Sequence, residues 1–260
     1  MNTKKVNKRF LKNYCNFEKL NNLIITFDID WAPEFMIEEI LEITKNLNIT
    51  IFNTHPSKLL KNLKSNRVCV GIHPNIQKGS SQGKDLNIIK NYLKNVGDFK
   101  YLRFHLLGHS SRDLEFFTQK GTKIDSSYYL PNQPFLIPTF WSSFDLVRVP
   151  YTWEDGFTLS SKKKIEKSIN LKDPGLKVLN FHPIDIYLNT CSIDQRNKFK
   201  NNFKSVLHSD KKSCEQFMNH KKFGVRDFLI NTINIIKNKK IKTTNFNELN
   251  YQFRRNLKII

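Results

Sequence analysis

Short apolar runs of strand length alternate with stretches of helical period along most of this chain, and the alternation largely decides the fold class. Such a pattern is typical of an α/β fold with parallel strands, because each helix returns the chain to the same edge of the sheet. Six segments predict strands: 23–29, 49–54, 67–73, 100–105, 145–150 and 177–182. We therefore expect an α/β fold with mostly parallel strands.

Helices are predicted at 34–48 and at 84–96. A short helix is predicted between them, opened by Pro56, because proline is preorganised for a first helical turn. The clearest helix follows Gly224, where apolar residues recur every three or four positions: Val225, Phe228, Leu229, Ile233 and Ile236. Residues 240–244 predict a last strand, and Asn245 an N-cap for a short terminal helix. The aromatic, Pro-rich segment 128–144 predicts an ordered loop.

One domain is expected for the whole chain. Its 260 residues, with 39% hydrophobic residues and 21 Phe, suffice for one sizeable core and are few for two large domains. The low numbers of Gly (9) and Cys (4) exclude collagen-like proteins and disulfide scaffolds. We predict a single domain over 1–260, with a basic N-terminal extension at 1–20, a core that carries the motifs at 23–190 and a helical C-terminal cover at 196–260.

Charge and targeting features predict a cytoplasmic protein. The apolar runs fall short of the roughly 18 residues that a membrane span needs, and the basic N-terminus lacks the apolar region of a signal peptide. The four cysteines form no CxxC pair, so free thiols are expected. The formal charge of +20 comes mostly from Lys scattered among Asn and Ile, which indicates a solvated basic surface and not a nucleic-acid site. The sequence gives no indication of the oligomeric state.

Polar side chains gather at the C-terminal ends of the predicted strands. In parallel α/β barrels and sheets, the loops after several strands meet at that edge and build the active site. A lone histidine there is commonly a hydrogen-bonded packing residue, whereas ionisable groups at five strand ends are hard to explain by packing. They are Asp28, Asp30, His55, His73, Arg103, His105 and His182. We expect five of them to meet in one pocket: Asp28, Asp30, His73, Arg103 and His182.

The spacing of Asp28 and Asp30 suggests metal chemistry. Residues adjacent but one at a strand end can both reach a shared site where the backbone turns, and two carboxylates attract a cation. If one of the pair binds a metal ion, the charge of the ion keeps the other ionised as a base. A water activated by the metal is then the natural nucleophile.

Five short motifs, in order and at similar spacing, resemble those of the polysaccharide deacetylase superfamily, which includes NodB-homology domains and carbohydrate esterases. They are ITFDIDW at 25–31, GIHPN at 71–75, RFH at 103–105, YTWED at 151–155 and NFHP at 180–183. The resemblance covers about residues 23–190. The HPN, RxH and NFHP motifs are most similar to the WbmS-like branch, which is associated with bacterial surface polysaccharides.

The resemblance implies a deformed (β/α) barrel and a divalent metal, usually zinc, held by an aspartate and two histidines. Carried over by position, Asp30 and His73 become metal ligands. The catalytic residues become Asp28 as general base, Arg103 as the group that keeps it ionised, His182 as the acid that protonates the leaving amine, and Asp155 as the carboxylate that orients His182.

One position departs from the family pattern. The usual second metal histidine falls at Gln77, or, in the WbmS-like branch, in a Ser-Ser-His-Gly segment that is Ser-Ser-Gln-Gly at 80–83 here. Gln82 becomes the third ligand by position, although a neutral amide is a poor zinc ligand. Otherwise His105 or His109 completes the group, the site prefers another cation, or the site has decayed.

The sequence thus predicts a hydrolase that removes an acetyl group from an N-acetylated sugar or a surface-polysaccharide intermediate. The alternative, motivated by Gln82, is a catalytically reduced member that binds a glycan or a partner on the same fold. A haloacid-dehalogenase phosphatase would require Thr or Val at the position of Ala32. A nucleotide-sugar transferase would require a nucleotide-binding half before its DxD motif. Neither class therefore fits this sequence well. For His55 a structural hydrogen bond is an equally good interpretation. The predicted substrate contacts are Trp31, His55, Asn75, His105 and Trp153.

Overall fold

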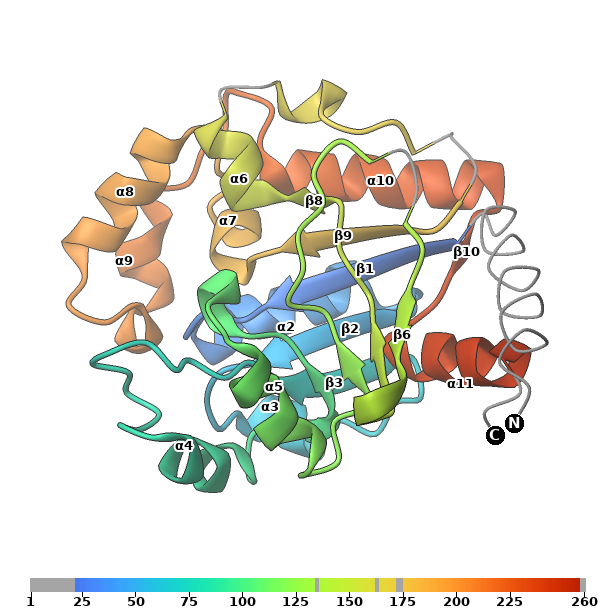
Figure 1. Ribbon diagram of the computed structural model, residues 1–260. Helices are drawn as coiled ribbons and strands as arrows, with labels where there is room; N and C mark the ends of the chain where they lie inside the picture. Colours follow the sequence, from blue (N-terminus) through green and yellow to red (C-terminus); the bar gives the residue numbers. More distant parts are fainter. Residues whose placement is uncertain (1–21, 134–135, 162–163, 172–174, 258–260) are drawn as a thin grey trace.

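A computed structural model of the chain describes residues 22–133, 136–161, 164–171 and 175–257. Its strands form one sheet in the order β6-β7-β5-β4-β3-β2-β1-β9-β8, with β10 beside β1, and every pair is parallel except β6 with β7. The strands are β1 (Asn22–Asp28), β2 (Ile49–Asn53), β3 (Val68–Ile72), β4 (Asp98–Leu102), β5 (Ile124–Asp125), β6 (Thr139–Trp141), β7 (Leu146–Arg148), β8 (Trp153–Glu154), β9 (Lys177–Phe181) and β10 (Lys242–Thr243). The sheet curls into an open barrel (Figure 1).

The helices lie around this sheet and at its two ends. They are α2 (Glu34–Ile43), α3 (Lys58–Asn62), α4 (Leu86–Leu93), α5 (Ser111–Thr118), α6 (Asp155–Ser160), α7 (Pro183–Tyr187), α8 (Ile193–Asn202), α9 (Lys211–Glu215), α10 (Val225–Lys239) and α11 (Phe246–Leu257). Short 3-10 helices span His105–Leu107, Ser142–Phe144, Ile165–Lys167 and Val206–His208. None of the helices in the described part is long and apolar enough to cross a membrane.

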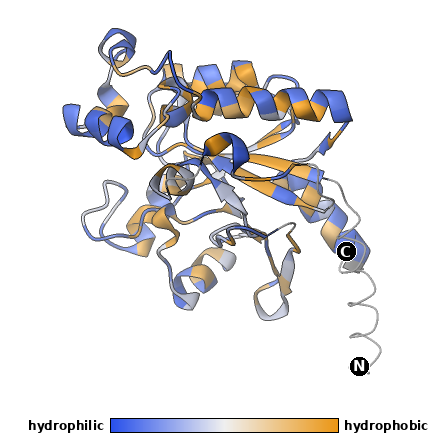
Figure 2. Cartoon of the chain, turned by 90° about the horizontal axis from the view of Figure 1, so that it is seen from above, coloured by the Kyte–Doolittle hydropathy of each residue, from blue (hydrophilic) through white to orange (hydrophobic). Residues whose placement is uncertain are grey.

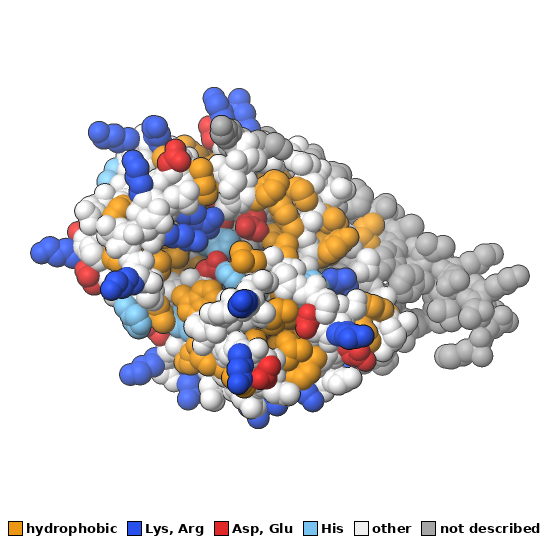
Figure 3. All heavy atoms as spheres, turned by 60° about the vertical axis from the view of Figure 1, so that its left-hand side comes forward, with side chains coloured by type: hydrophobic (Ala, Val, Ile, Leu, Met, Phe, Trp, Pro, Cys, Tyr) orange, Lys and Arg blue, Asp and Glu red, His pale blue; other side chains and the backbone are white. Residues whose placement is uncertain are grey.

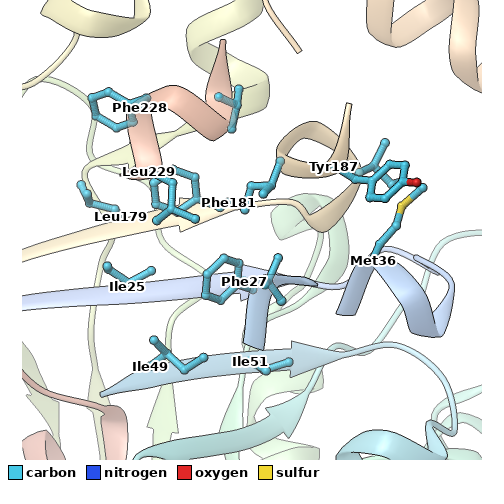
Figure 4. Close-up of a cluster of buried hydrophobic side chains, with 14 of the residues drawn as sticks. Ile25, Phe27, Met36, Ile49, Ile51, Leu179, Phe181, Tyr187, Phe228 and Leu229 are labelled. Atoms are coloured by element: carbon cyan, nitrogen blue, oxygen red, sulfur yellow. The ribbon is translucent and has the colours of Figure 1, made fainter. Parts of the chain in front are cut away.

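The central strands are buried on both faces because helices and other strands cover both. All residues of β1, β2 and β9 are buried, and Figure 2 shows the hydrophobic colour concentrated along them. On one face, Phe27 of β1 and Phe181 of β9 pack beneath Phe228 and Leu229 of α10 (Figure 4). This dry layer fixes the register of the strands, and therefore the position of the residues that follow them.

The terminal helix α11 closes the end of the barrel where the strands begin. Phe246, Leu249 and Phe253 are buried in a second cluster with Phe52, and the Phe246 amide donates to Thr50 Oγ1. Helices α8 and α9 lie at the opposite end, where β1 and β9 finish (Figure 1). The open end of the barrel is therefore the one with the C-terminal strand ends.

The structure confirms the predicted fold class, a deformed α/β barrel of mostly parallel strands, and differs in several boundaries. Helix α2 ends at Ile43, before the predicted residue 48, because Thr44 leaves helical geometry and its hydroxyl donates to the Ile40 carbonyl. Segment 128–144 is not only a loop, since it contains β6 and a 3-10 helix. Strands β5 and β8, of two residues each, and β6 are too short for the sequence pattern to reveal.

The remaining predictions of this kind concern the C-terminal helices, the cysteines and the N-terminal extension. The predicted helix after Gly224 is α10, and Asn245 caps α11 by accepting from the Glu248 amide. Cys69, Cys191 and Cys214 are free thiols. The N-terminal extension at 1–20 and Cys15 lie outside the described residues.

Candidate active site

The predicted site residues stand at the C-terminal ends of four parallel strands, at the open end of the barrel. Asp28 ends β1, His73 follows β3, Arg103 follows β4 and His182 follows β9. Asp30 lies two residues beyond β1. A cavity of about 340 Å³ is lined by most of these groups, and Figure 3 shows histidine and acidic side chains gathered in a hollow of the surface beside basic ones. The strand ends therefore converge on one pocket.

Asp30, His73 and His105 form a group with metal-binding geometry, in which one ligand atom from each lies within 4.8 Å of the others. Asp30 Oδ1 is 3.0 Å from His105 Nδ1 and 3.3 Å from His73 Nε2. That oxygen is buried, yet it has no well-aligned hydrogen bond among the described residues. One carboxylate and two imidazoles with an unpaired oxygen between them form a donor set that suits zinc. These residues thus fit the metal that the sequence implied.

The backbone after β1 turns the Asp30 side chain towards the histidines. Asp30 and Trp31 both have left-handed conformations, with φ of 46° and 59°, which are strained for residues other than Gly. The Trp31 amide donates to Thr54 Oγ1, and this bond holds the turn in place. Burial alone would raise the pKa of Asp30, but the neighbouring His105 and His73 hold it well below its usual range. The carboxylate is therefore ionised.

The orientation of His73 is fixed by the neighbouring strand end. Its Nδ1 lies 2.7 Å from the Arg103 carbonyl and donates to it, so Nε2 is the ring nitrogen that faces Asp30. A backbone acceptor behind a ligating imidazole sets its tautomer in many metal sites. The His105 ring lies edge-on to both His73 and Trp31, with centroids 5.3 and 5.1 Å away.

Asp28 has a different environment from Asp30, because both of its oxygens accept hydrogen bonds. Arg103 donates to Oδ1 at 2.9 Å and Asn180 donates to Oδ2 at 2.8 Å. Burial alone would raise the pKa of Asp28, but the Arg103 guanidinium lowers it below the usual value. The result is an ionised, oriented carboxylate whose Oδ2 lies 4.0 Å from His73 Nε2.

The Arg103 side chain is fully buried and has a partner on every side. Its guanidinium lies between the rings of Phe52 and Tyr151, 4.4 Å from each centroid. It donates to Thr26 and Ser126 as well as to Asp28. A charge at 0% exposure is stable only with such pairing, so Arg103 and Asp28 depend on one another.

His182 and Asp155 form a second buried pair beside the metal-binding group. His182 Nδ1 lies 2.6 Å from Asp155 Oδ1, and the His182 amide donates to Oδ2 of the same carboxylate. The other ring nitrogen, Nε2, is 3.5 Å from Asp30 Oδ2. Burial alone would lower the pKa of His182, but the negative charge and hydrogen bond of Asp155 raise it to about 10. His182 is therefore a cation that can donate a proton into the pocket.

Arg196 of α8 extends this pair and was not found from the sequence. It forms an ion pair with Asp185 and lies 3.9 Å from Asp155. Arg196 thus adds positive charge behind the Asp155 carboxylate and lines the cavity. Helix α8 follows the region that carries the motifs, so the positions of the strand ends could not indicate that Arg196 reaches the site. Asn180, also missed, lies within the NFHP motif and could have been assigned from its strand position.

Gln82, aligned with a metal ligand by position, has its side chain turned towards backbone groups of its own loop and of the neighbouring strand ends. Its Oε1 accepts from the Asn75 amide at 2.7 Å, and its Nε2 donates to the carbonyls of Thr54 and His73. Both of its N–H groups and its oxygen are thus bonded to backbone. His105 is the third member of the group with Asp30 and His73. His109 stacks on Phe104 and does not belong to the group.

The predicted substrate contacts divide into two sets. Trp31 and Asn75, together with His105, line a groove that adjoins the first cavity. His55 and Trp153 line neither this groove nor the cavity. His55 is buried and pairs with Thr54 Oγ1, whereas the 2% exposed Trp153 stacks on Phe228 in the core and donates to Ser168.

An apolar wall, which the sequence did not predict, forms part of the lining of the same cavity. Leu106, Tyr129 and Phe157 line it, and the first and last are 74% and 47% exposed. The rings of Tyr129 and Phe157 meet edge to face with centroids 5.1 Å apart. Exposed aromatic faces suit the stacking of a sugar ring.

Comparisons with known proteins agree with this geometry. The family model of WbmS-like polysaccharide deacetylases matches residues 25–200, about two thirds of the chain. A crystal structure of WbmS from Bordetella bronchiseptica, described as a candidate polysaccharide deacetylase involved in O-antigen biosynthesis, has 26% identity to this chain and a TM-score of 0.72. The match covers 82% of this chain and 89% of that one. A comparison with curated proteins gave no match.

The family match spans the motifs at which Asp28, Asp30, His73, Arg103 and His182 stand, and the matching crystal structure has the same open barrel. The chain therefore belongs to the WbmS-like polysaccharide deacetylases.

Proposed function

We propose that the protein is a metal-dependent hydrolase that removes an acetyl group from an N-acetylated sugar or from an intermediate of a surface polysaccharide. The observation that carries the proposal is the arrangement around Asp30. A metal-binding group lies between an ionised carboxylate, Asp28, and a protonated imidazole, His182, in a single cavity. Hydrolysis of an amide needs these three functions: polarisation, a base and an acid.

Asp30, His73 and His105 would hold the metal, for which zinc is the candidate that best fits the donor set. When bound, a divalent cation lowers the pKa of water and polarises the acetyl carbonyl. The protein must then provide proton transfer and position the substrate.

Asp28 is the proposed general base. It accepts a proton from the attacking water, and the oxygen of that water forms the new bond to the acetyl carbon. Arg103 and Asn180 hold its two oxygens in fixed directions. A base with a low pKa is weak, but it stays ionised beside Asp30, and its two partners fix its orientation.

His182 is the proposed general acid. As the carbon–nitrogen bond breaks, it donates its Nε2 proton to the leaving amine, so that acetate and a free amino sugar are formed. Asp155 binds Nδ1 and holds the ring in place. The apolar wall of Leu106, Tyr129 and Phe157 would support the sugar ring.

The alternative of a catalytically reduced binder is the weaker candidate. It was motivated by Gln82, and that side chain serves the backbone of its own loop while His105 completes a three-residue group. The relative described for O-antigen biosynthesis supports a surface-polysaccharide intermediate as the substrate class.

The proposal is tested by measuring bound zinc and acetate release in two variants, His105→Gln and His109→Gln. Both make the same change at neighbouring histidines. His105→Gln should lose most bound zinc and most acetate release from a panel of N-acetylated sugars, because a ligand is removed. His109→Gln should keep both, since His109 lies outside the group. Equal zinc loss in both variants, or acetate release that a strong chelator does not reduce in the wild type, contradicts metal dependence.

A further inference from the structure

A second cavity adjoins the proposed active site and differs from it in charge. This groove of about 490 Å³ shares Asp30 and His105 with the first cavity. Trp31 and Asn75 line it from the loops after β1 and β3, and Phe203 lines it from the end of α8. A ligand could therefore extend from the metal-binding group in two directions, one along each cavity.

The groove is basic on the side of α8. Lys200, in the last turn of that helix, and Lys204, just beyond it, both line the groove and are exposed. In the described part of the chain, neither ammonium has a carboxylate within 4.0 Å, and Asp30 is the only acidic residue among those that line the groove. The hydroxyls of Ser81 and Ser205 add further donors. The two positive charges are thus available to an anionic ligand.

We propose that this groove binds a phosphate group of the substrate, so that the enzyme acts on a phosphate-bearing N-acetylated sugar and not on a neutral glycan. The inference rests on the proposed deacetylase function and adds the substrate class to it. The sugar ring would contact the apolar wall of the first cavity, and its phosphate would lie between Lys200 and Lys204.

Phosphate fits the groove better than a carboxylate does. Lysine binds phosphate as a compact point charge, whereas planar carboxylates are best matched by the fork of arginine. A phosphate carries up to two negative charges, equal to the two ammonium groups. The cation expected at Asp30 would offset the one negative charge in the groove. The formal charge of +20 also favours the approach of an anionic substrate.

Binding and kinetics on a matched pair of ligands test the inference. N-acetylglucosamine and N-acetylglucosamine 1-phosphate differ only in the phosphate. We compare the zinc-loaded wild type, the double variant Lys200→Gln/Lys204→Gln, and the control Lys198→Gln, which removes an exposed charge of α8 outside the groove. Dissociation constants come from calorimetry and kcat/KM values from acetate release.

The wild type and the control should prefer the phosphorylated sugar by about tenfold in both measurements, the effect expected of two exposed charge contacts. The double variant should lose this preference, mainly through KM. The preference is a ratio between two ligands on one protein, so the bound metal, present in all three proteins, does not affect the comparison among them.

Other results have distinct meanings. Equal affinity for the two ligands in the wild type, or a preference that survives in the double variant, overturns the phosphate subsite even if acetate is released. A lysine-dependent preference in binding without any acetate release supports the subsite and contradicts the deacetylase function. With UDP-N-acetylglucosamine as a third ligand, a further gain that depends on the two lysines indicates a nucleotide-linked source of the phosphate, and no gain indicates another carrier.

Discussion

Replacing Gln82 by Leu should destabilise the protein, because its side chain bonds to backbone groups. The side chain is 2% exposed and joins three backbone groups: the Asn75 amide and the carbonyls of Thr54 and His73. Leucine is of similar size and cannot form any of these bonds. The change therefore removes the hydrogen bonds with little change in packed volume.

The expected magnitude follows from the three bonds. A buried hydrogen bond contributes about 1 kcal/mol net, and backbone groups left without partners in a dry loop add to the loss. We expect the free energy of unfolding to fall by about 3 kcal/mol. Because one of the lost bonds holds the His73 carbonyl, zinc affinity should fall as well.

Urea unfolding of the metal-free protein measures the first effect, and zinc titration the second. Gln77→Leu is the matched control, since Gln77 is exposed in the same loop and should lose less than about 0.5 kcal/mol. A loss under about 1 kcal/mol in Gln82→Leu would refute the structural role. Gln82→His gives an independent test: tighter zinc binding in that variant would show that this position faces the metal after all.

Three further predictions concern the catalytic groups. Asp28→Asn should keep bound zinc and lose at least about a hundredfold in acetate release, whereas Asp30→Asn should lose both; equal zinc loss by metal analysis would mean that the roles are reversed or shared. Arg103→Met should lower the free energy of unfolding by about 3–5 kcal/mol in urea titrations, because it leaves Asp28 charged and buried, and a loss under about 1 kcal/mol would argue against that pair. Asp155→Asn should move the alkaline limb of the kcat/KM profile at least about one pH unit lower, since the Asp155 charge raises the pKa of His182 and activity is lost as the acid deprotonates; an unmoved limb would assign that limb to another group.

The sequence was sufficient for the residues that belong to strands. Parallel strands end at one edge, so Asp28, His73, Arg103 and His182 could be placed together from hydrophobic runs alone. The motif comparison also paired Asp155 with His182, and the structure has them 2.6 Å apart. Asp155 follows the two-residue strand β8 and was placed by the motif alone. The other four positions have a common cause: backbone hydrogen bonding of buried strands fixes where the next residues lie.

The failures concern side chains whose direction depends on loops and on distant helices. Gln82 was aligned with a ligand by position, but the loop around it turns the amide towards backbone groups. Trp153, in a two-residue strand, points into the core where Phe228 of α10 covers it. Arg196 reaches the site from a helix beyond the motifs. Sequence spacing contains none of this information.

The different environments of Asp28 and Asp30 explain how two carboxylates so close in sequence can have different functions. Asp28 remains within the strand geometry, and Arg103 and Asn180 occupy both of its oxygens, so it is held charged and aimed without a metal. Asp30 lies after the strand in a left-handed turn, and its buried Oδ1 faces two imidazoles without a well-aligned hydrogen bond. An oxygen that its own fold leaves unpaired is suited to a cation, whereas a carboxylate that is already fully oriented is suited to proton transfer. The proposed assignment of ligand and base, which the DxD spacing alone left open, therefore rests on the hydrogen bonds that each aspartate makes and lacks.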